Sequence, residues 1–419
     1  MPGAEVTRLD GAVIPGMPNL HCHAFQRLMA GLGQATTGSA DSFWTWREVM
    51  YAMAGRVSPE QLEACAAGLY VEMLKSGYTS CAEFHYLHHA PGGEPYADPS
   101  ELGQRVLAGA VSAGIGLTLL PVFYRRSGFG AADVTPRQAR FRHSLDGFIE
   151  LVNGLSGAIR MFPRARLGVA PHSLRAANID EIAAIVGEFS DIPVHIHIAE
   201  QRLEVEECTA ALGAPPVAWL LNHFDVDSRW CLVHATHMTD SERQDAAATG
   251  AVAGLCPTTE ADLGDGIFPA AQWQASRGAW GIGSDSNLRI CPAEELRLLE
   301  FSQRLATGRR NVLAGGQGST GQSMWAAAAT GGARAMGQPV GRLEPGCRAD
   351  LVELDLSHPR LEGLSGSQWL DSYIFAGDRD MIASVTVAGE QVVVAGRHHA
   401  EDTILPAFNR VLATLRPSH

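Results

Sequence analysis

The stretch IPVHIHIAE (192–200) is made of β-branched and apolar residues, with histidine at two alternate positions. Runs of this kind predict short β-strands, and here they alternate with amphipathic stretches of helical length. Such runs occur at 12–23, 78–86, 116–124, 166–173, 192–200, 229–237, 251–260 and 279–287. Strands that alternate with helices favour parallel βα units over a sandwich. Eight such units predict an α/β fold, namely a (β/α)8 TIM barrel.

The stretches between the predicted strands carry the start and stop signals of helices. In SPEQLEACAAGLYVEMLKSG (58–77), Ser58 is an N-cap residue, Pro59 occupies the first helical position and Gly77 ends the helix. In a barrel of βα units, functional sites lie where the strands end and the βα loops begin. The chemistry of this chain is therefore to be sought at its strand ends.

A second, smaller domain is expected after the barrel. From about residue 340 the chain reads GRLEPGCRADLVELDL and later MIASVTVAGEQVVVAGRHH (381–399), with alternating β-branched residues and glycine turns. We assign 12–336 to the barrel, and 1–11 plus 337–419 to a small β-sandwich-like domain. Because only about a dozen residues precede the first strand, this domain is expected to lack some N-terminal strands.

Composition excludes several classes of protein. Of the 419 residues, 46% are hydrophobic and 18% charged, which argues against a disordered or fibrous chain. The net charge of −13 repels nucleic acid and anionic membranes, so neither is expected as a partner. The eight cysteines include no C-x-x-C pair, and no apolar run is long enough to span a bilayer. We expect a cytoplasmic protein that pairs as a homodimer, as such barrels often do.

Histidines and one aspartate gather at the predicted strand ends. His21 and His23 lie two residues apart, and the period of a strand places both imidazoles on one face. His197, His234 and Asp285 follow at the ends of three later strands. Imidazole and carboxylate ligands suit a divalent ion such as zinc, which activates water for hydrolysis. The pleat turns Cys22, between the first two histidines, away from this site.

Five segments together resemble the amidohydrolase superfamily, and within it the iminohydrolases of histidine degradation. They are PGMPNLHCHAFQR (15–27), HIHIAEQ (195–201), CLVHATH (231–237), LCPTTEADLGDG (255–266) and GSDSN (283–287). The resemblance covers nearly the whole chain and implies a barrel of the metal-dependent hydrolase type. It implies that the metal ligands are His21, His23, His197 and Asp285. His195 is assigned a structural role.

A single divalent ion, with zinc as the first choice, is expected in this site. Binuclear members of the superfamily carry a modified lysine at the end of the fourth strand, but this chain reads APHSLR (170–175) there. In the implied mechanism Asp285 takes a proton from the attacking water, Glu200 protonates the departing nitrogen, and His234 stabilises the tetrahedral adduct. The implied reaction is hydrolysis of N-formimino-L-glutamate, a small-molecule substrate, to N-formyl-L-glutamate and ammonia.

The substrate carries two carboxylates, which an acidic protein must hold with local donors. Arg175 is best placed to bind one of them bidentately. The resemblance adds Gln26, Tyr86 and His172 to the substrate-binding residues. Tryptophans in DSFWTWREVM (41–50) are expected to pack a lid over the barrel mouth.

Two other functions are compatible with the same motifs. The first is a superfamily deaminase that acts on a purine, a pyrimidine or a thioadenosine, against which Arg175 argues because it favours a carboxylate. The second is a non-catalytic barrel that serves as a scaffold or binding protein, against which the complete set of ligands argues. Asn287 stands where some relatives have histidine. Seven further histidines, among them His88 and His143, are expected in turns or the tail.

Overall fold

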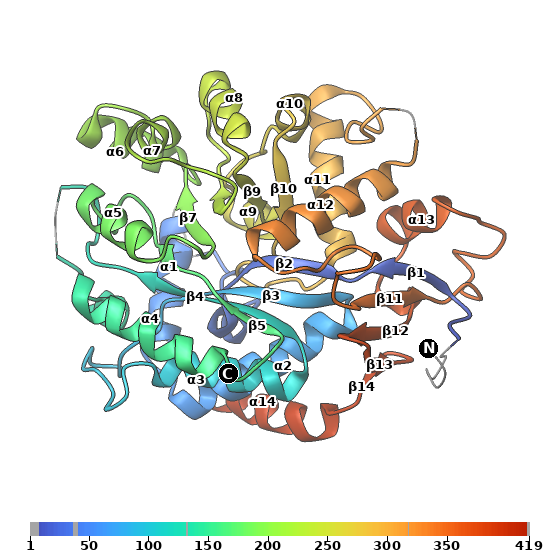
Figure 1. Cartoon of the computed structure of the whole chain (residues 1–419), viewed down its shortest axis with the longest axis horizontal. Coiled ribbons are helices and arrows are strands. Elements are labelled where there is room, and N and C mark those ends of the chain that lie inside the picture. The colour runs from blue at the N-terminus through green and yellow to red at the C-terminus, as the bar shows by residue number, and fades with distance from the viewer. Residues whose placement is uncertain (1–7, 37–40, 131–132, 317, 417–419) are drawn as a thin grey trace.

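The computed structural model describes residues 8–36, 41–130, 133–316 and 318–416. Its centre is a barrel of parallel strands surrounded by helices (Figure 1). The barrel strands are β2 (Met17–Cys22), β3 (Tyr78–His85), β4 (Gly116–Phe123), β5 (Ala165–Leu167), β6 (Ala170–Pro171), β7 (Val194–Ile198), β8 (Trp230–His234), β9 (Val252–Leu255) and β10 (Ala279–Ile282). Because β5 and β6 both pair with β4, they form one interrupted strand. The predicted (β/α)8 barrel is confirmed.

Two parallel sheets close on each other to complete the barrel. One contains β2 to β6 and the other runs β10-β9-β8-β7. An isolated parallel bridge between Val169 and Val194 joins them on one side, and a bridge between Cys22 and Asp285 joins them on the other. The second bridge brings the first and last barrel strands together at the mouth.

The helices follow the strands in the predicted alternation. They are α1 (Phe43–Ala54), α2 (Pro59–Lys75), α3 (Glu101–Ala113), α4 (Leu145–Ile159), α5 (Ile179–Glu188), α6 (Arg202–Leu212), α7 (Pro216–His223), α8 (Asp240–Thr249), α9 (Pro257–Leu263), α10 (Ala270–Ala275), α11 (Pro292–Thr307), α12 (Thr320–Ala335), α13 (Gln368–Ala376) and α14 (Glu401–Leu415). Helix α2 begins after Ser58, which confirms the predicted N-cap. The Ser58 side chain accepts the backbone N–H of Gln61 in a capping box. The run 251–260, expected to be one strand, instead ends as β9 at Leu255, and Pro257 then starts α9.

A five-stranded antiparallel sheet lies beside the barrel. Its order is β1-β11-β12-β13-β14, with strands β1 (Ala12–Pro15), β11 (Leu351–Leu354), β12 (Ile382–Val387), β13 (Glu390–Val394) and β14 (Arg397–His398). The run 12–23, expected to be one barrel strand, is therefore divided between two sheets. The division falls at Gly16, whose backbone N–H donates to the carbonyl of Asp350. Residues 1–7 and 417–419 of the predicted small domain lie outside the described residues.

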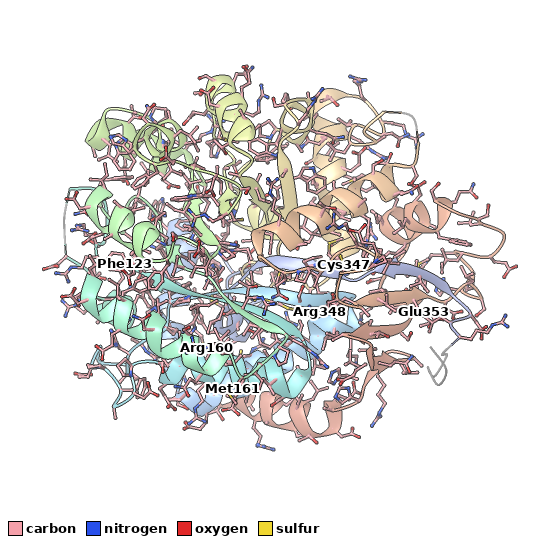
Figure 2. All side chains as sticks on the ribbon, viewed as in Figure 1. Phe123, Arg160, Met161, Cys347, Arg348 and Glu353 are labelled. Atoms are coloured by element: carbon pink, nitrogen blue, oxygen red, sulfur yellow. The ribbon has the colours of Figure 1, made fainter. Side chains whose placement is uncertain are left out.

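The segment that leads into β11 packs against the barrel. Arg348, labelled in Figure 2, contacts Asp350 at 2.7 Å, and its guanidinium packs against Gly116 at the start of β4. The C-terminal segment, expected to continue the β domain, instead forms α14 and packs on α2. There Lys75 pairs with Glu401 at 2.8 Å. Among the described residues, no helix has the length and hydropathy needed to cross a bilayer.

Candidate active site

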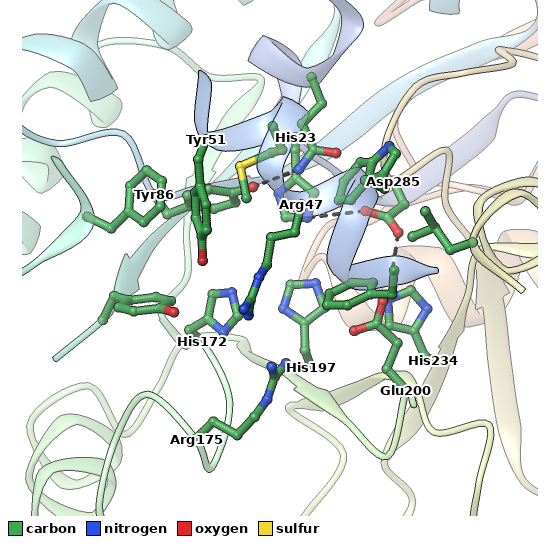
Figure 3. Close-up of a pocket in the computed structure, with 17 residues that line it drawn as sticks. His23, Arg47, Tyr51, Tyr86, His172, Arg175, His197, Glu200, His234 and Asp285 are labelled. Atoms are coloured by element: carbon green, nitrogen blue, oxygen red, sulfur yellow. Dashed lines mark hydrogen bonds and ion pairs between the residues drawn. The ribbon is translucent and has the colours of Figure 1, made fainter. Parts of the chain in front are cut away.

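Four predicted ligand side chains converge at the barrel mouth. An Nε2 or carboxylate oxygen from each of His21, His23, His197 and Asp285 lies within 4.8 Å of those of the other three, and all four residues are buried. The Nε2 atom of His21 lies 3.2 Å from that of His23 and 3.0 Å from that of His197. Asp285 Oδ1 lies 3.1 Å from the His23 Nε2 atom. Figure 3 shows His23, His197 and Asp285 directed toward the same point.

The donor set fits a divalent cation. Burial lowers the pKa of His21 to about 3 and also holds that of His197 well below its usual value, so both rings are neutral. The Nδ1 atom of His23 lies 2.9 Å from the carbonyl of Phe84 and is suited to donate to it, which leaves a lone pair on Nε2. Nitrogen lone pairs that face one another at these distances are satisfied by a cation between them. Three imidazoles and one carboxylate match the ligands of catalytic metal sites.

The strand that supplies Asp285 meets the strand of the paired histidines at very close range. A Cβ atom at Gly283 would lie 2.7 Å from the carbonyl oxygen of His21, so only glycine fits there. Asp285 itself has a φ of 42°, and His234 on β8 has a φ of 66°. Left-handed backbone is costly for such residues and is common in functional sites. Hydrogen bonds between His21 and Asp285 and between Ile198 and Ala235 hold these two turns.

His234 is surrounded by three carboxylates. Its Nε2 atom lies 3.6 Å from Asp285 and 3.7 Å from Glu200, and its Nδ1 atom lies 3.2 Å from Glu260. Burial opposes a charge on the ring, but the carboxylates of Glu200 and Glu260 raise the pKa of His234 well above its ordinary value. Burial also raises the pKa of Glu200. Glu200 is thus suited to hold a proton, and His234 to donate a hydrogen bond to developing negative charge.

Two arginines extend into the pocket beside this cluster. Arg175 follows β6, and Arg47 lies on α1, which supplies several residues of the pocket lining. Figure 3 shows both side chains directed into the pocket. Neither forms an ion pair with an acidic side chain in the described chain, and the Nε atom of each is buried there without a hydrogen-bond partner. Both guanidinium groups lie near the ring of Trp44, at 4.3 Å for Arg47 and 5.9 Å for Arg175. Two unpaired guanidinium groups suit an anionic ligand.

The other predicted substrate-binding residues line the same pocket. The amide of Gln26 donates to the hydroxyl of Tyr86 at 2.6 Å, and the Gln26 carbonyl oxygen is buried with no hydrogen-bond partner among the described residues. Burial raises the pKa of Tyr86 well above its usual value, so its phenol is neutral. The ring of His172 lies 5.0 Å from that of His197, which places it beside the predicted metal ligands. These three polar side chains therefore share the pocket with the predicted metal ligands.

Three residues discussed from sequence contact other groups. The Cys22 thiol lies 3.4 Å from Asn287, and the metal-ligand group at the mouth does not include it. Asn287 donates to the carbonyl of His23 at 2.8 Å and does not line the pocket. His195 is directed to the carbonyl of Ala335 on α12 at 2.8 Å. These three side chains therefore contact neighbouring protein groups and do not line the pocket.

Arg47 and Glu260 are site residues that were not identified from sequence. Both fall inside segments quoted for other reasons: Arg47 in the predicted lid and Glu260 in LCPTTEADLGDG. An arginine flanked by tryptophans, and a glutamate directly after a strand, are weak signals on their own. Their role becomes apparent only when α1 and α9 are packed over the barrel.

Comparison with known proteins agrees with this geometry. A model of the amidohydrolase family matches residues 12–392. A curated formimidoylglutamate deiminase from Pseudomonas aeruginosa is 50% identical over 415 residues, which cover 99% of this chain and 91% of that protein.

Solved structures share the fold. The crystal structure of an amidohydrolase from Brucella melitensis superposes with a TM-score of 0.93 at 50% identity, over 98% of this chain and 93% of that one. An adenosine deaminase from Xanthomonas campestris with bound zinc gives a TM-score of 0.81 at 23% identity, over 97% and 86% of the two chains. The match of the family model over most of the chain, together with the His-His-His-Asp group, shows that this protein belongs to the amidohydrolase family.

Proposed function

We propose that this protein hydrolyses N-formimino-L-glutamate to N-formyl-L-glutamate and ammonia, a step of histidine degradation. The observation that carries this proposal is a metal-ligand group that shares one pocket with Arg47 and Arg175, neither of which pairs with an acidic side chain of the described residues. The substrate offers an amidine for hydrolysis and two carboxylates for the arginines. The same assignment is supported by the sequence identity of 50%, over 99% of this chain, to a protein named formimidoylglutamate deiminase.

We propose a single zinc ion, held by His21, His23, His197 and Asp285. Support comes from the donor set and from the bound zinc of the Xanthomonas campestris structure. A divalent ion in such a site acts as a Lewis acid and lowers the pKa of coordinated water to about 7. Metal analysis of the active protein that finds two equivalents per chain would contradict the single-ion proposal.

The side chains of Asp285, His234 and Glu200 are assigned to proton transfer and to stabilisation of negative charge. Asp285 accepts a proton from the attacking water. His234, whose Nε2 atom lies 3.6 Å from Asp285, donates a hydrogen bond to the oxygen that becomes negative as the water attacks the amidine carbon. Glu200, which lies 3.7 Å from the same Nε2 atom, gives its proton to the departing nitrogen, and ammonia leaves.

The carboxylates of the substrate are assigned to the opposite part of the pocket. Arg175 and Arg47 each bind one carboxylate, and the desolvated pocket strengthens both interactions. Gln26, Tyr86 and His172 complete the polar wall and fix the distance from the carboxylates to the amidine carbon. Because the arginines are built on different elements, a ligand with two separated anionic groups is favoured over a flat heterocycle.

The test is a direct product analysis. Purified protein loaded with zinc is incubated with N-formimino-L-glutamate, and the products are identified by NMR together with an assay for ammonia. N-formyl-L-glutamate and ammonia are expected in equal amounts. Their formation must stop after treatment with a chelator and resume when zinc is added.

We also propose that the enzyme works in the cytoplasm as a homodimer, without nucleic-acid or membrane partners. The charge of −13 supports the last point.

A further inference from the structure

Asp265 is a buried acid directly behind Glu200. It lies in the loop after α9 and is 3% exposed. Its Oδ1 atom accepts the side-chain amide of Gln201, while Oδ2 is buried and has no hydrogen-bond partner in the described part of the chain. A carboxylate oxygen of Asp265 lies within 4.8 Å of ligand atoms of both Glu200 and His234. A carboxyl group with a free oxygen thus faces the residue that acts as the acid.

The backbone of Asp265 is fixed on both sides. Its N–H donates to the carbonyl of Glu260 at 2.9 Å. Its own carbonyl lies 2.6 Å from the Nε2 atom of His237, which is suited to donate to it. The side chain therefore has a defined position, with a carboxylate oxygen within 4.8 Å of one of Glu200.

Asp265 and Glu200 face different pockets. Glu200 lines the active-site pocket. Asp265 lines a second pocket on the outside of the barrel mouth, together with Arg202, His237 and Thr239. The two carboxyl groups therefore lie between the active-site pocket and the second pocket.

The electrostatics of the pair favour one retained proton. Burial, followed by the charge of Glu200, raises the pKa of Asp265 to about 9. Two buried carboxylates at this separation do not both ionise readily at neutral pH. The charged or titratable groups that face Asp265 are Glu200, His234, Glu260 and Asp285 on the inner side, and Arg202, Glu206 and His237 around the outer pocket.

We propose that Asp265 and Glu200 share one proton, and that Asp265 passes a proton from the outer pocket to Glu200 after each turnover. Asp265 touches no substrate and is a positioning residue that acts through Glu200. The proposal rests on the proposed function.

The proton balance of the reaction explains why Glu200 needs a new proton after each turnover. For a neutral amidine, the attacking water loses two protons, and the nitrogen gains two as its bond to carbon breaks. Asp285 takes both protons from the water, passes one to the nitrogen and releases the other to solvent. Glu200 delivers the second proton that the nitrogen needs.

The test uses the zinc-loaded full chain and the variant Asp265→Asn, which keeps a neutral polar group of the same size. We expect normal metal content and KM, a kcat at least about 10-fold lower at neutral pH, and an alkaline limb of the pH–rate profile shifted to lower pH. The shift is expected because an asparagine at this position cannot share a proton with Glu200. The Glu200 carboxyl group therefore ionises at a lower pH in this variant. Asp265→Glu should restore part of kcat, and Asp245→Asn, on the exposed face of α8, should change neither value. Wild-type kcat with an unmoved alkaline limb in Asp265→Asn would overturn the proposal.

An infrared measurement tests the pair without turnover. The difference spectrum between wild type and Asp265→Asn at pH 7 should contain the band of one protonated carboxyl group, and its absence would overturn the shared proton. If the wild type fails to hydrolyse formiminoglutamate, the proposed function fails while this band still tests the pair. If Asp265→Asn does not fold, the same band is sought in the difference between wild type and Asp265→Glu, as a shift in position. An unshifted spectrum there counts against the proposal.

Discussion

The Nδ1 atom of His234 lies 3.2 Å from Oε1 of Glu260, and the same oxygen accepts the backbone N–H of Cys256 at 2.8 Å. Glu260 is therefore fixed by the start of α9 and fixes the ring of His234 in turn. An acceptor at Nδ1 places a proton there and orients Nε2 toward Glu200 and Asp285. The orientation of one catalytic side chain thus depends on a helix that covers the barrel mouth.

Replacing Glu260 with Gln should lower kcat by about 10- to 100-fold. The amide keeps the size of the side chain but removes the negative charge that holds the proton on His234 Nδ1. Steady-state kinetics of the zinc-loaded variant will measure the effect, with Asp245→Asn as the control on α8. An unchanged kcat would show that Glu260 only caps α9.

Replacing Glu200 with Gln should leave the metal bound and reduce turnover by about 10²- to 10⁴-fold. The reason is that an amide cannot deliver a proton to the departing nitrogen. Because Glu200 is outside the His-His-His-Asp group, metal content measured by mass spectrometry should equal that of the wild type. Near-normal turnover at full metal content would remove Glu200 from the mechanism.

Replacing Arg175 or Arg47 with Met should raise KM for formiminoglutamate by about 10- to 100-fold, the loss expected for one charged hydrogen bond. Methionine keeps the apolar part of each side chain, while the charge is lost. Arg310→Met, at an exposed position, is the matched control. If both variants keep the wild-type KM, the two carboxylates are held elsewhere.

The barrel was predictable because its signal is repeated. Each predicted strand contains or overlaps a strand of the structure, since apolar runs and helix caps such as Ser58 act locally. The division of 12–23 between two sheets was not predictable, because Ala12–Pro15 and Met17–Cys22 read as one apolar run. Only the pairing of β1 with β11, more than 300 residues later in sequence, separates them.

The ligands of the site were predictable for a different reason. In a parallel barrel all strand ends point to one mouth, so His21 and Asp285 could be brought together without knowledge of any loop. Arg47 lies on α1 and Glu260 on α9, and their positions depend on how these helices pack over the mouth. His88 and His143, expected in turns, lie in loops that are buried, because residues far away in sequence cover them.

Stability should fall as the pH drops below about 6.5, the ordinary pKa of histidine. Burial lowers the pKa of His85 and of His143 to about 3, so both rings remain neutral in the folded protein. Between pH 6.5 and 3 the unfolded chain binds these protons and the folded chain does not. Each histidine therefore lowers the free energy of unfolding by up to about 1.4 kcal/mol per pH unit in that range.

Urea titrations at several pH values measure this slope. The variant His143→Gln should reduce the slope, whatever its effect on stability at pH 7, because one proton-binding site is lost from the unfolded state. A slope equal to that of the wild type would show that His143 is protonated in the folded protein.

The central claim is that a metal-ligand cluster and two arginines select a dicarboxylate amidine. The most direct measurement is kcat/KM for ammonia release by the zinc-loaded protein from N-formimino-L-glutamate, compared with guanine, cytosine and 5′-methylthioadenosine. We predict efficient release from formiminoglutamate and a value at least about 10³-fold lower for each ring, because the two half-buried arginines are then left without an anion. Ammonia release from any of these rings at a comparable or higher kcat/KM would contradict the proposed function.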